Sequence, residues 1–148
     1  SVYNVHLKSN RFNRNEAALV SKKEWPSWDD STLEQSKSIF SKLQDNSVNR
    51  GLEAELIANT IQQHKRPAIV CGDFNDIPSS YVYFKIKDQR RDAFLEKGSG
   101  IGATFRNAVP LLRIDYVFHD TTFTLLGFEQ AQVAYSDHEP LMANFSMK

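Results

Sequence analysis

The feature that most constrains the fold is a short apolar run, Ala68–Cys71, followed at once by the tetrapeptide GDFN at residues 72–75. The run is typical of a buried strand, and GDFN is then the start of the loop after it. An acid and an amide two residues apart at a strand end, beside a glycine that permits close approach to the backbone, commonly form a phosphate site. The pattern therefore predicts both a central strand and a candidate site at its end.

Strands and helices are mixed along the rest of the chain. Alternating β-forming side chains predict strands at residues 1–7, 113–119, 122–131 and 141–147. Helical spacing predicts a rough helix from about residue 31 to 43, a clearer one at 52–63, and a short one at 79–87. In the short helix we expect Tyr81 and Phe84 to face inward. The order indicates an α+β fold, with a mixed, largely antiparallel sheet flanked by helices as packed layers.

Length and charge limit the classes of function. At 148 residues the chain is one domain or a piece of one, and its 18 basic and 18 acidic residues balance. Neutrality argues against broad, non-specific nucleic-acid binding, which usually needs a basic excess. Cys71 is the one cysteine, so no internal disulfide is possible, and no apolar stretch is long enough to span a membrane. The start within a strand, without Met or a leader, leads us to expect a piece of a longer protein, and localisation cannot be assigned.

Several polar side chains suited to phosphate chemistry lie at predicted strand ends or in the adjoining loops. They are His6, Asp73, Asn75, Asp115, Asp137 and His138. Hydrolysis of a phosphoester needs a nucleophilic water, a group that orients or deprotonates it, and positive charge on the phosphoryl oxygens, part of which a metal ion usually supplies. These sequence-distant groups could converge on one rim of the fold.

Each of these residues also has a structural interpretation. Asp73 could cap an Asx turn, and Asp115 could form an ion pair with Arg113. His6 could be a partly buried histidine, and residues 137–140 could be a polar turn before proline. Each alternative is reasonable alone, but the accidental occurrence of all of them in this order is improbable.

The motifs and their order along the chain resemble those of the endonuclease/exonuclease/phosphatase superfamily, also called DNase I-like. The motifs are a histidine at a strand end (His6), GDFN, RIDYVF at residues 113–118, and SDHEP at residues 136–140. Arg50, followed by Glu53 on a helix, is also similar to the family. The resemblance implies a DNase I-like layered α/β sandwich.

The resemblance also implies roles for the candidate residues. Asp73 would activate or orient the attacking water, and Asn75 would hydrogen-bond the phosphate. His138 would contact the scissile phosphate, its imidazole held in orientation by Asp115. Asp137 would lie at a divalent metal site, with Mg²⁺ (or Mn²⁺) as the expected ion. His6 would bind the phosphate or act as an acid near the leaving group.

The family's early Asn and its main metal ligand, a Glu, have no counterpart before His6. The resemblance therefore implies that residues 1–148 are the C-terminal part of one domain, inactive as an isolated fragment. The missing N-terminal half would be its partner, and we expect the fragment to self-associate through its exposed sheet face. The substrate stays open among DNA, RNA, inositol phosphates, phospholipid head groups and other phosphate esters.

The sequence leaves two other classes of function open. One is a non-catalytic interaction domain that kept the fold. The other is a zinc hydrolase using His6, Asp73 and His138, which the lack of a closely spaced His-x-x-x-His pair disfavours.

Overall fold

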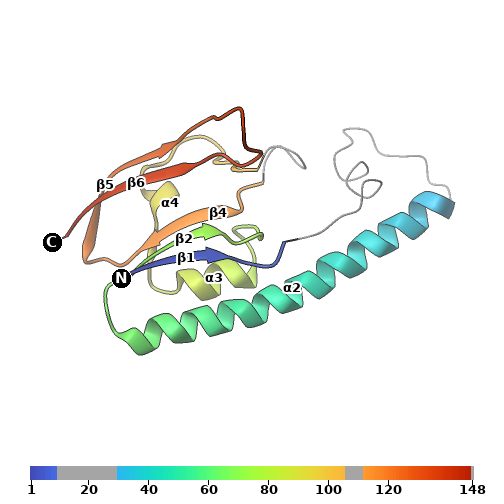
Figure 1. Cartoon of the computed structure of the whole chain (residues 1–148), viewed down its shortest axis with the longest axis horizontal. Coiled ribbons are helices and arrows are strands. Elements are labelled where there is room, and N and C mark those ends of the chain that lie inside the picture. The colour runs from blue at the N-terminus through green and yellow to red at the C-terminus, as the bar shows by residue number, and fades with distance from the viewer. Residues whose placement is uncertain (10–29, 106–111, 148) are drawn as a thin grey trace.

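A computed structural model describes residues 1–9, 30–105 and 112–147. The main elements are the strands β1 (Val2–His6), β2 (Ile69–Asp73), β3 (Arg91–Asp92), β4 (Asp115–His119), β5 (Phe123–Gln130) and β6 (Leu141–Met147), and the helices α2 (Asp30–His64), α3 (Tyr81–Lys87) and α4 (Ala93–Lys97). Figure 1 shows the helices α2 and α3 below the strands and the β5–β6 pair above them.

The strands form two sheets. The larger has the order β1-β2-β4-β3, with β1 parallel to β2 and the other neighbours antiparallel. The smaller is the antiparallel pair β5–β6. The predicted α+β class with a mixed, largely antiparallel sheet is confirmed.

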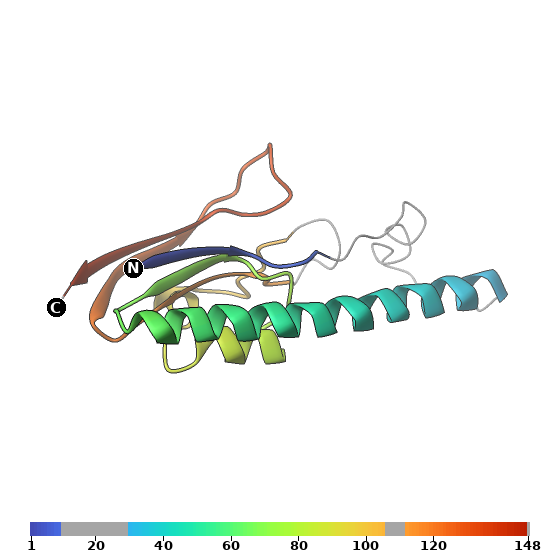
Figure 2. The ribbon, with the colours of Figure 1, turned by 60° about the horizontal axis from the view of Figure 1, so that its bottom comes forward.

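Two apolar cores separate three layers. The first lies between the four-stranded sheet and the helices α2 and α3, and it contains the rings of Phe74, Tyr83, Tyr116 and Phe118. The second lies on the opposite face, where Val117 of β4 packs with side chains of the β5–β6 pair. The turned view in Figure 2 shows α2 running along one side of the sheet with the β5–β6 pair on the other. Each face of the sheet is therefore covered by a different layer.

Helix α2 is a single helix of 35 residues, whereas the sequence predicted two helices. No proline interrupts it, and the polar run at residues 45–51, a turn signal in the sequence, is helical in the structure. Its buried stripe consists of small residues, Ala54 and Ala58, together with Ile61. Leu56, one of the apolar residues within the helix predicted at 52–63, is 69% exposed. The side chains at residues 30–40, 42 and 43, including most of the predicted first stripe, lie outside the described ones.

Helix α3 buries different residues from those predicted. Tyr81 and Phe84 are exposed, and the residues that face the core are Val82, Tyr83 and Ile86. The expectation that Tyr81 and Phe84 point inward was wrong. Val82, Tyr83 and Ile86 lie on one face of the helix and pack in the first core, whereas the Tyr81 hydroxyl donates to Glu55 of α2.

Strand β4 has the alternation that the sequence predicted. Ile114, Tyr116 and Phe118 are buried in or near the first core, and Val117 faces the second. Asp115 shares the face of Val117, at the end of the strand. In the part of the chain that the structure describes, no helix combines the length and apolar character needed to cross a membrane.

Candidate active site

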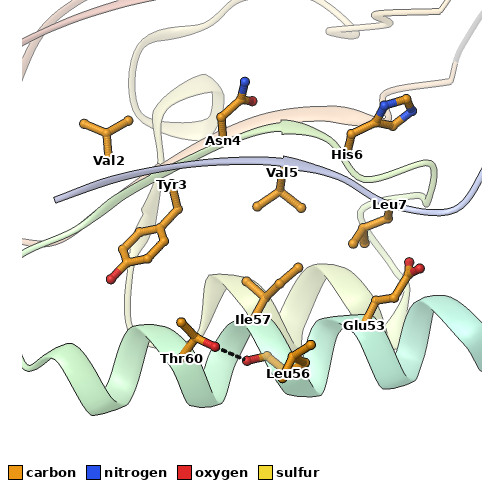
Figure 3. Close-up of a pocket in the computed structure, with 10 residues that line it drawn as sticks. All are labelled: Val2, Tyr3, Asn4, Val5, His6, Leu7, Glu53, Leu56, Ile57 and Thr60. Carbon is orange, nitrogen blue, oxygen red and sulfur yellow. Dashed lines mark hydrogen bonds between the residues drawn. The ribbon is translucent and has the colours of Figure 1, made fainter.

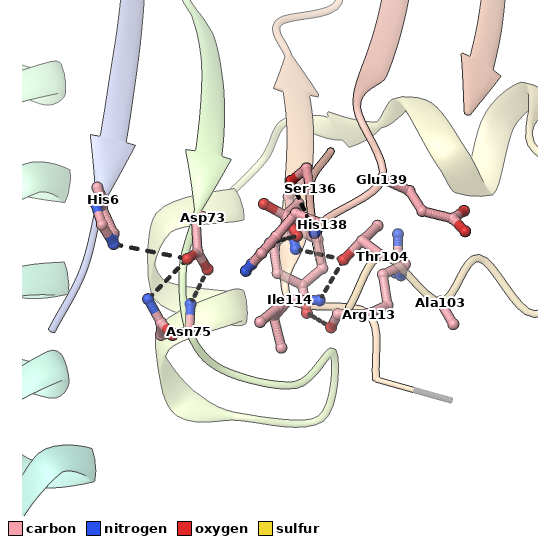
Figure 4. A network of polar contacts seen from close by, with 12 residues as sticks. His6, Asp73, Asn75, Ala103, Thr104, Arg113, Ile114, Ser136, His138 and Glu139 are labelled. Atoms are coloured by element: carbon pink, nitrogen blue, oxygen red, sulfur yellow. Dashed lines mark hydrogen bonds and ion pairs between the residues drawn. The ribbon is translucent and has the colours of Figure 1, made fainter. Parts of the chain in front are cut away.

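The site is built where neighbouring strands end at one edge of the sheet. His6 is the last residue of β1, Asp73 the last of β2, and Asp115 the first of β4. Because β1 runs parallel and β4 antiparallel to β2, these three ends coincide, and the register pairs His6 with Asp73 and Asp73 with Asp115. Residues far apart in sequence are thus adjacent across the sheet (Figure 4).

Gly72 makes this strand packing possible. Its φ of 133° lies in a region that side chains with a Cβ rarely adopt. A Cβ built there would lie 1.9 Å from the carbonyl oxygen of Val5 in β1. The close approach that the sequence attributed to a ligand is therefore made by the neighbouring strand.

The residues after Gly72 point in alternate directions. Asp73 accepts hydrogen bonds from the Asn75 main-chain N–H at 2.8 Å and from its side-chain Nδ2 at 2.9 Å. The Asn75 amide also donates to the carbonyl oxygen of Leu7 (3.0 Å), and its φ of 50° is one that Asn tolerates. Phe74 points the other way and is fully buried against Tyr116. The Asx-turn interpretation of Asp73 is therefore also correct, and the turn fixes both polar side chains.

The second half of the site is a carboxylate–imidazole pair. Nδ1 of His138 lies 2.9 Å from Oδ2 of Asp115. The His138 N–H donates to the hydroxyl of Ser136, and its ring lies 4.9 Å from the ring of Phe105. The predicted Asp115–His138 contact is present, and Nε2 is the ring atom left to face a ligand.

His6 and Asp137 are placed differently from this pair. The His6 side chain is 75% exposed, and its Nε2 lies 3.7 Å from Oδ2 of Asp73. Asp137 is exposed, and it is not part of the group whose ligand atoms lie within 4.8 Å of one another, which consists of Asp73, Asp115 and His138. The structure thus brings five of the six predicted residues together and leaves Asp137 at their margin.

Burial shapes the electrostatics of this group. Loss of solvent raises the pKa of the Asp73 carboxyl above its usual value, and the nearby Asp115 charge raises it further. The Asn75 N–H, His138 and His6 act in the opposite direction but do not reverse the shift. An open cavity of about 270 Å³ borders the pair, with Asn4 and Asp115 among its lining residues.

The loop after Asp73 is tied to the helix layer by Arg50. This buried residue of α2 donates from Nε to Oδ2 of Asp76 at 3.0 Å and from Nη1 to the carbonyl oxygen of Lys8 at 3.3 Å. The Tyr116 hydroxyl lies 2.8 Å from the Asp76 carbonyl oxygen. Arg50 is therefore a structural residue that holds the ends of β1 and β2 against α2.

Arg113 does not pair with Asp115. Its Nη1 donates to Oδ2 of Asp92 at 2.8 Å, and Tyr83 donates to the same oxygen at 2.9 Å. The guanidinium also lies over the Phe94 ring, 4.7 Å from its centroid. The structural interpretation of Asp115 as a partner of Arg113 is wrong, because Asp92 takes that place and leaves Asp115 for His138.

Comparison with known proteins agrees with this geometry. The profile of the Endonuclease/Exonuclease/phosphatase family matches residues 5–138, which includes every residue of the site. This chain belongs to the Endonuclease/Exonuclease/phosphatase family. Members of this family are phosphoester hydrolases. No curated protein sequence matches the chain.

Solved structures of the Endonuclease/Exonuclease/phosphatase fold are similar to this one. An endonuclease/exonuclease/phosphatase from Bacteroides vulgatus is 28% identical, with a TM-score of 0.59, over 69% of this chain and 45% of that one. A functionally unknown conserved protein from Enterococcus faecalis V583 is 21% identical, with a TM-score of 0.61, over 69% and 46%. Bacteroides thetaiotaomicron mannosyl-6-phosphatase is 21% identical, with a TM-score of 0.54, over 67% and 46%. The chain spans less than half the length of each.

The donor set fits a divalent cation in part. Asp73 and Asp115 supply carboxylate oxygens, the hard ligands that Mg²⁺ and Mn²⁺ prefer. The third member, His138, offers a nitrogen, and its Nδ1 is already in contact with Asp115. The Endonuclease/Exonuclease/phosphatase family is generally metal-dependent. These residues would hold such an ion only with additional oxygen ligands.

Sequence reasoning missed Thr104 and Ser136 as parts of the site. The hydroxyl of Thr104 accepts hydrogen bonds from the main-chain N–H groups of Ile114 and Asp115. The hydroxyl of Ser136 accepts one from the main-chain N–H of His138. Ser136 lies within the SDHEP word, so its position offered a signal. Thr104 follows a glycine-rich turn and belongs to no motif, so only tertiary contacts reveal it.

Proposed function

We propose that this chain is the C-terminal part of a metal-dependent phosphoester hydrolase that cleaves its substrate by attack of water on phosphorus. The observation that carries the proposal is the convergence of Asp73, Asp115, His138 and His6 at one sheet edge. The family match supports it, because the matched segment contains this whole group.

Asp73 is the residue that orients and deprotonates the attacking water. Its carboxylate is fixed by both nitrogens of Asn75, and partial burial raises its pKa, which makes it a better base than an exposed carboxylate. Asn75 Nδ2 donates its two hydrogens to the Leu7 carbonyl oxygen and to Asp73, so Asn75 fixes the Asp73 carboxylate, and it would hydrogen-bond a phosphoryl oxygen by giving up one of these two bonds.

His138 is the residue that contacts the scissile phosphate. Its contact with Asp115 fixes the orientation of the ring and leaves Nε2 to donate a hydrogen bond to a phosphoryl oxygen. His6 is exposed beside Asp73, where it binds the phosphate or protonates the leaving group. Imidazole groups on both sides of the Asp73 carboxylate suit a substrate with negative charge.

A Mg²⁺ or Mn²⁺ ion would supply positive charge for the phosphoryl oxygens. The carboxylates of Asp73 and Asp115 are candidate ligands on geometry, and Asp137 is the candidate that the family resemblance implies. Its exposure leaves Asp137 accessible to an ion held partly by the rest of the longer protein. The main Glu and Asn ligands would come from that part.

The substrate class is a phosphate ester, either a phosphodiester, as in a nuclease or phosphodiesterase, or a phosphomonoester, as in a phosphatase. Nucleic acid, a phospholipid head group and a sugar phosphate all remain candidates. One structural neighbour is described as a mannosyl-6-phosphatase, which keeps phosphomonoesters among the substrates to be tested. The balanced charge of the chain favours a compact ligand over a long polyanion.

The open edge of β1 is the surface through which we propose that the chain meets the missing N-terminal half. Within the described residues β1 pairs only with β2. A groove of about 590 Å³ runs between this strand and α2 (Figure 3). Val2 and Leu56, which line it, are 70% and 69% exposed. Without that half, a second copy of the chain would cover the same surface.

The experiment compares the longer protein with the 148-residue chain. Hydrolysis of bis(p-nitrophenyl) phosphate and of p-nitrophenyl phosphate is measured with Mg²⁺, Mn²⁺ and Zn²⁺, and with a chelator. We expect turnover by the longer protein with Mg²⁺ or Mn²⁺, and none by the isolated chain. Full turnover by the 148 residues alone would refute the fragment proposal, and activity with Zn²⁺ alone would favour the zinc hydrolase.

A non-catalytic domain that kept the fold is the alternative. It predicts that the longer protein lacks turnover with every metal and both substrates. The retained Asp115–His138 contact argues against it, since a domain without chemistry has no need of an oriented imidazole beside two carboxylates.

A further inference from the structure

Thr104 lies behind the Asp115–His138 pair and contacts both of its segments. The residue is 1% exposed. Its Oγ1 accepts hydrogen bonds from the main-chain N–H groups of Ile114 at 3.1 Å and Asp115 at 3.2 Å. One hydroxyl oxygen thus satisfies two consecutive amides at the beginning of β4.

The main chain of Thr104 holds the other half of the pair. Its carbonyl oxygen accepts a hydrogen bond from the N–H of Glu139 at 2.8 Å. The next residue, Phe105, forms a β-bridge with His138 and places its ring against the imidazole. Figure 4 shows Thr104 between Ile114 and the segment that carries His138.

The hydroxyl is the only part of the side chain that can serve the two amides. The carbonyl oxygen of Ile114 is used by the N–H of Phe74, so the ladder with β2 leaves the N–H groups of Ile114 and Asp115 facing Thr104. A hydroxyl oxygen has two lone pairs and can accept both bonds. Serine keeps this capacity, whereas valine has the same shape as threonine but leaves two buried donors unpaired.

We propose that Thr104 is the positioning residue of the Asp115–His138 pair, with its hydroxyl setting the backbone of Asp115 and its main chain setting that of His138. The catalytic importance of the pair rests on the proposed function. The positioning itself is a property of the folded chain and can be measured without substrate or metal.

The test is NMR of the metal-free 148-residue chain labelled with ¹⁵N-histidine. The chain has four histidines, and His138→Gln assigns the resonance of interest. In the wild type we expect the His138 Nδ1–H to give a resonance that exchanges slowly with water. Thr104→Ser should keep it and Thr104→Val should lose it. Thr124→Val is the matched control, because Thr124 is an exposed residue of β5, in the other sheet.

Two results would overturn the proposal: retention of the His138 resonance in Thr104→Val, or its loss in Thr104→Ser as completely as in Thr104→Val. Amide exchange in the wild type and Thr104→Ser gives a second measurement for the case in which Thr104→Val does not fold. The amides of Ile114 and Asp115 should exchange slowly in both, and fast exchange of either in the wild type would also refute the idea.

Turnover by the longer protein separates this inference from the proposed function. Loss of the His138 resonance in Thr104→Val, together with an inactive wild-type enzyme, would sustain the positioning and reject the hydrolase. An active enzyme whose Thr104→Val variant keeps both turnover and the His138 ring resonance would sustain the hydrolase and reject the positioning role of Thr104.

Discussion

Asp73 is subject to two opposing demands. Ionised, it can orient a water molecule, but burial and the neighbouring Asp115 make the ionised form unfavourable in the folded chain. The hydrogen bonds from Asn75 offset part of that penalty. The site therefore keeps a carboxylate that weakens the fold at neutral pH, as functional groups often do.

Replacement of Asp73 with Asn tests this directly. The pKa of Asp73 is raised in the folded chain, so the folded state binds the proton more tightly and stability falls as the pH rises through the carboxyl range. The difference in Tm, wild type minus Asp73→Asn, should decrease as the pH rises above about 4, the ordinary pKa of an aspartate. Thermal unfolding in chelator-containing buffers measures it. A difference that is constant or grows with pH would contradict the account.

Arg113 is the residue on which a buried polar cluster depends. Its partner Asp92 is almost fully buried, and Asp92 also caps α4 by accepting from the N–H of Phe94. Burial beside Asp92 raises the pKa of Tyr83 to about 12, so that hydroxyl remains a donor. Without Arg113, a buried carboxylate would lose its only charged partner among the described residues.

We expect Arg113→Met to lower the free energy of unfolding by about 3–5 kcal/mol, the usual effect of breaking a buried ion pair from one side. Arg91→Met is the control. Arg91 is 56% exposed in its side chain and lies 3.7 Å from Glu96, so its loss should change stability by less than about 1 kcal/mol. Urea unfolding measures both variants. Equal, small effects would show that the Arg113 cluster contributes little.

At the scale of elements, the β1–β2 pair brings the site together. The connection from β1 to β2 is a crossover that contains α2, so the two strands run parallel. Their register puts His6 beside Asp73. Leu7 continues the ladder by donating its N–H to the Asp73 carbonyl oxygen. Any change that separates these strands should therefore disturb fold and site together.

Gly72→Ala should separate them. The added methyl group would meet the Val5 carbonyl within 1.9 Å, and the backbone φ of 133° is unfavourable for alanine. We expect a loss of stability on the order of 3 kcal/mol or more. Gly127→Ala in β5 is the matched control, since its nearest atom would lie at 3.7 Å. Similar denaturant midpoints for the two variants would mean that β1 is not held closely against β2.

At the scale of the whole molecule, the open β1 edge and its groove are the surface that predicts association. The isolated chain should self-associate with rising concentration, as sedimentation velocity can show. Leu56→Lys should shift the association equilibrium of the isolated chain towards the monomer, because the lysine would place a charge in the groove. Leu95→Lys, at a residue of α4 that is 66% exposed, should not. A wild-type chain that stays monomeric at high concentration would count against this surface.

The sequence predicted the parts of this molecule that local pattern controls. Short-range spacing predicts the Ala68–Cys71 strand, the alternation along β4, and the two motifs that contain Asp73 and His138. Sequence reasoning missed the unbroken α2, which continues through the polar run at residues 45–51. It also missed features that depend on tertiary contact: the inward face of α3, the pairing of Arg113 with Asp92, and the role of Thr104. The glycine of GDFN was noticed, but its partner, Val5, lies 67 residues away in sequence and could not be inferred locally.

The central claim is that Asp73 and His138 form one phosphoester-hydrolysing centre. The most direct measurement is kcat/KM for bis(p-nitrophenyl) phosphate with Mg²⁺ in the longer protein carrying Asp73→Asn, His138→Gln or, as control, Thr124→Val at an exposed residue of β5. The account predicts losses of about 10²–10⁴-fold for the first two, as expected for removal of an acid–base or charge-stabilising group, and none for the control. Wild-type turnover in either site variant, with folding intact, would contradict it.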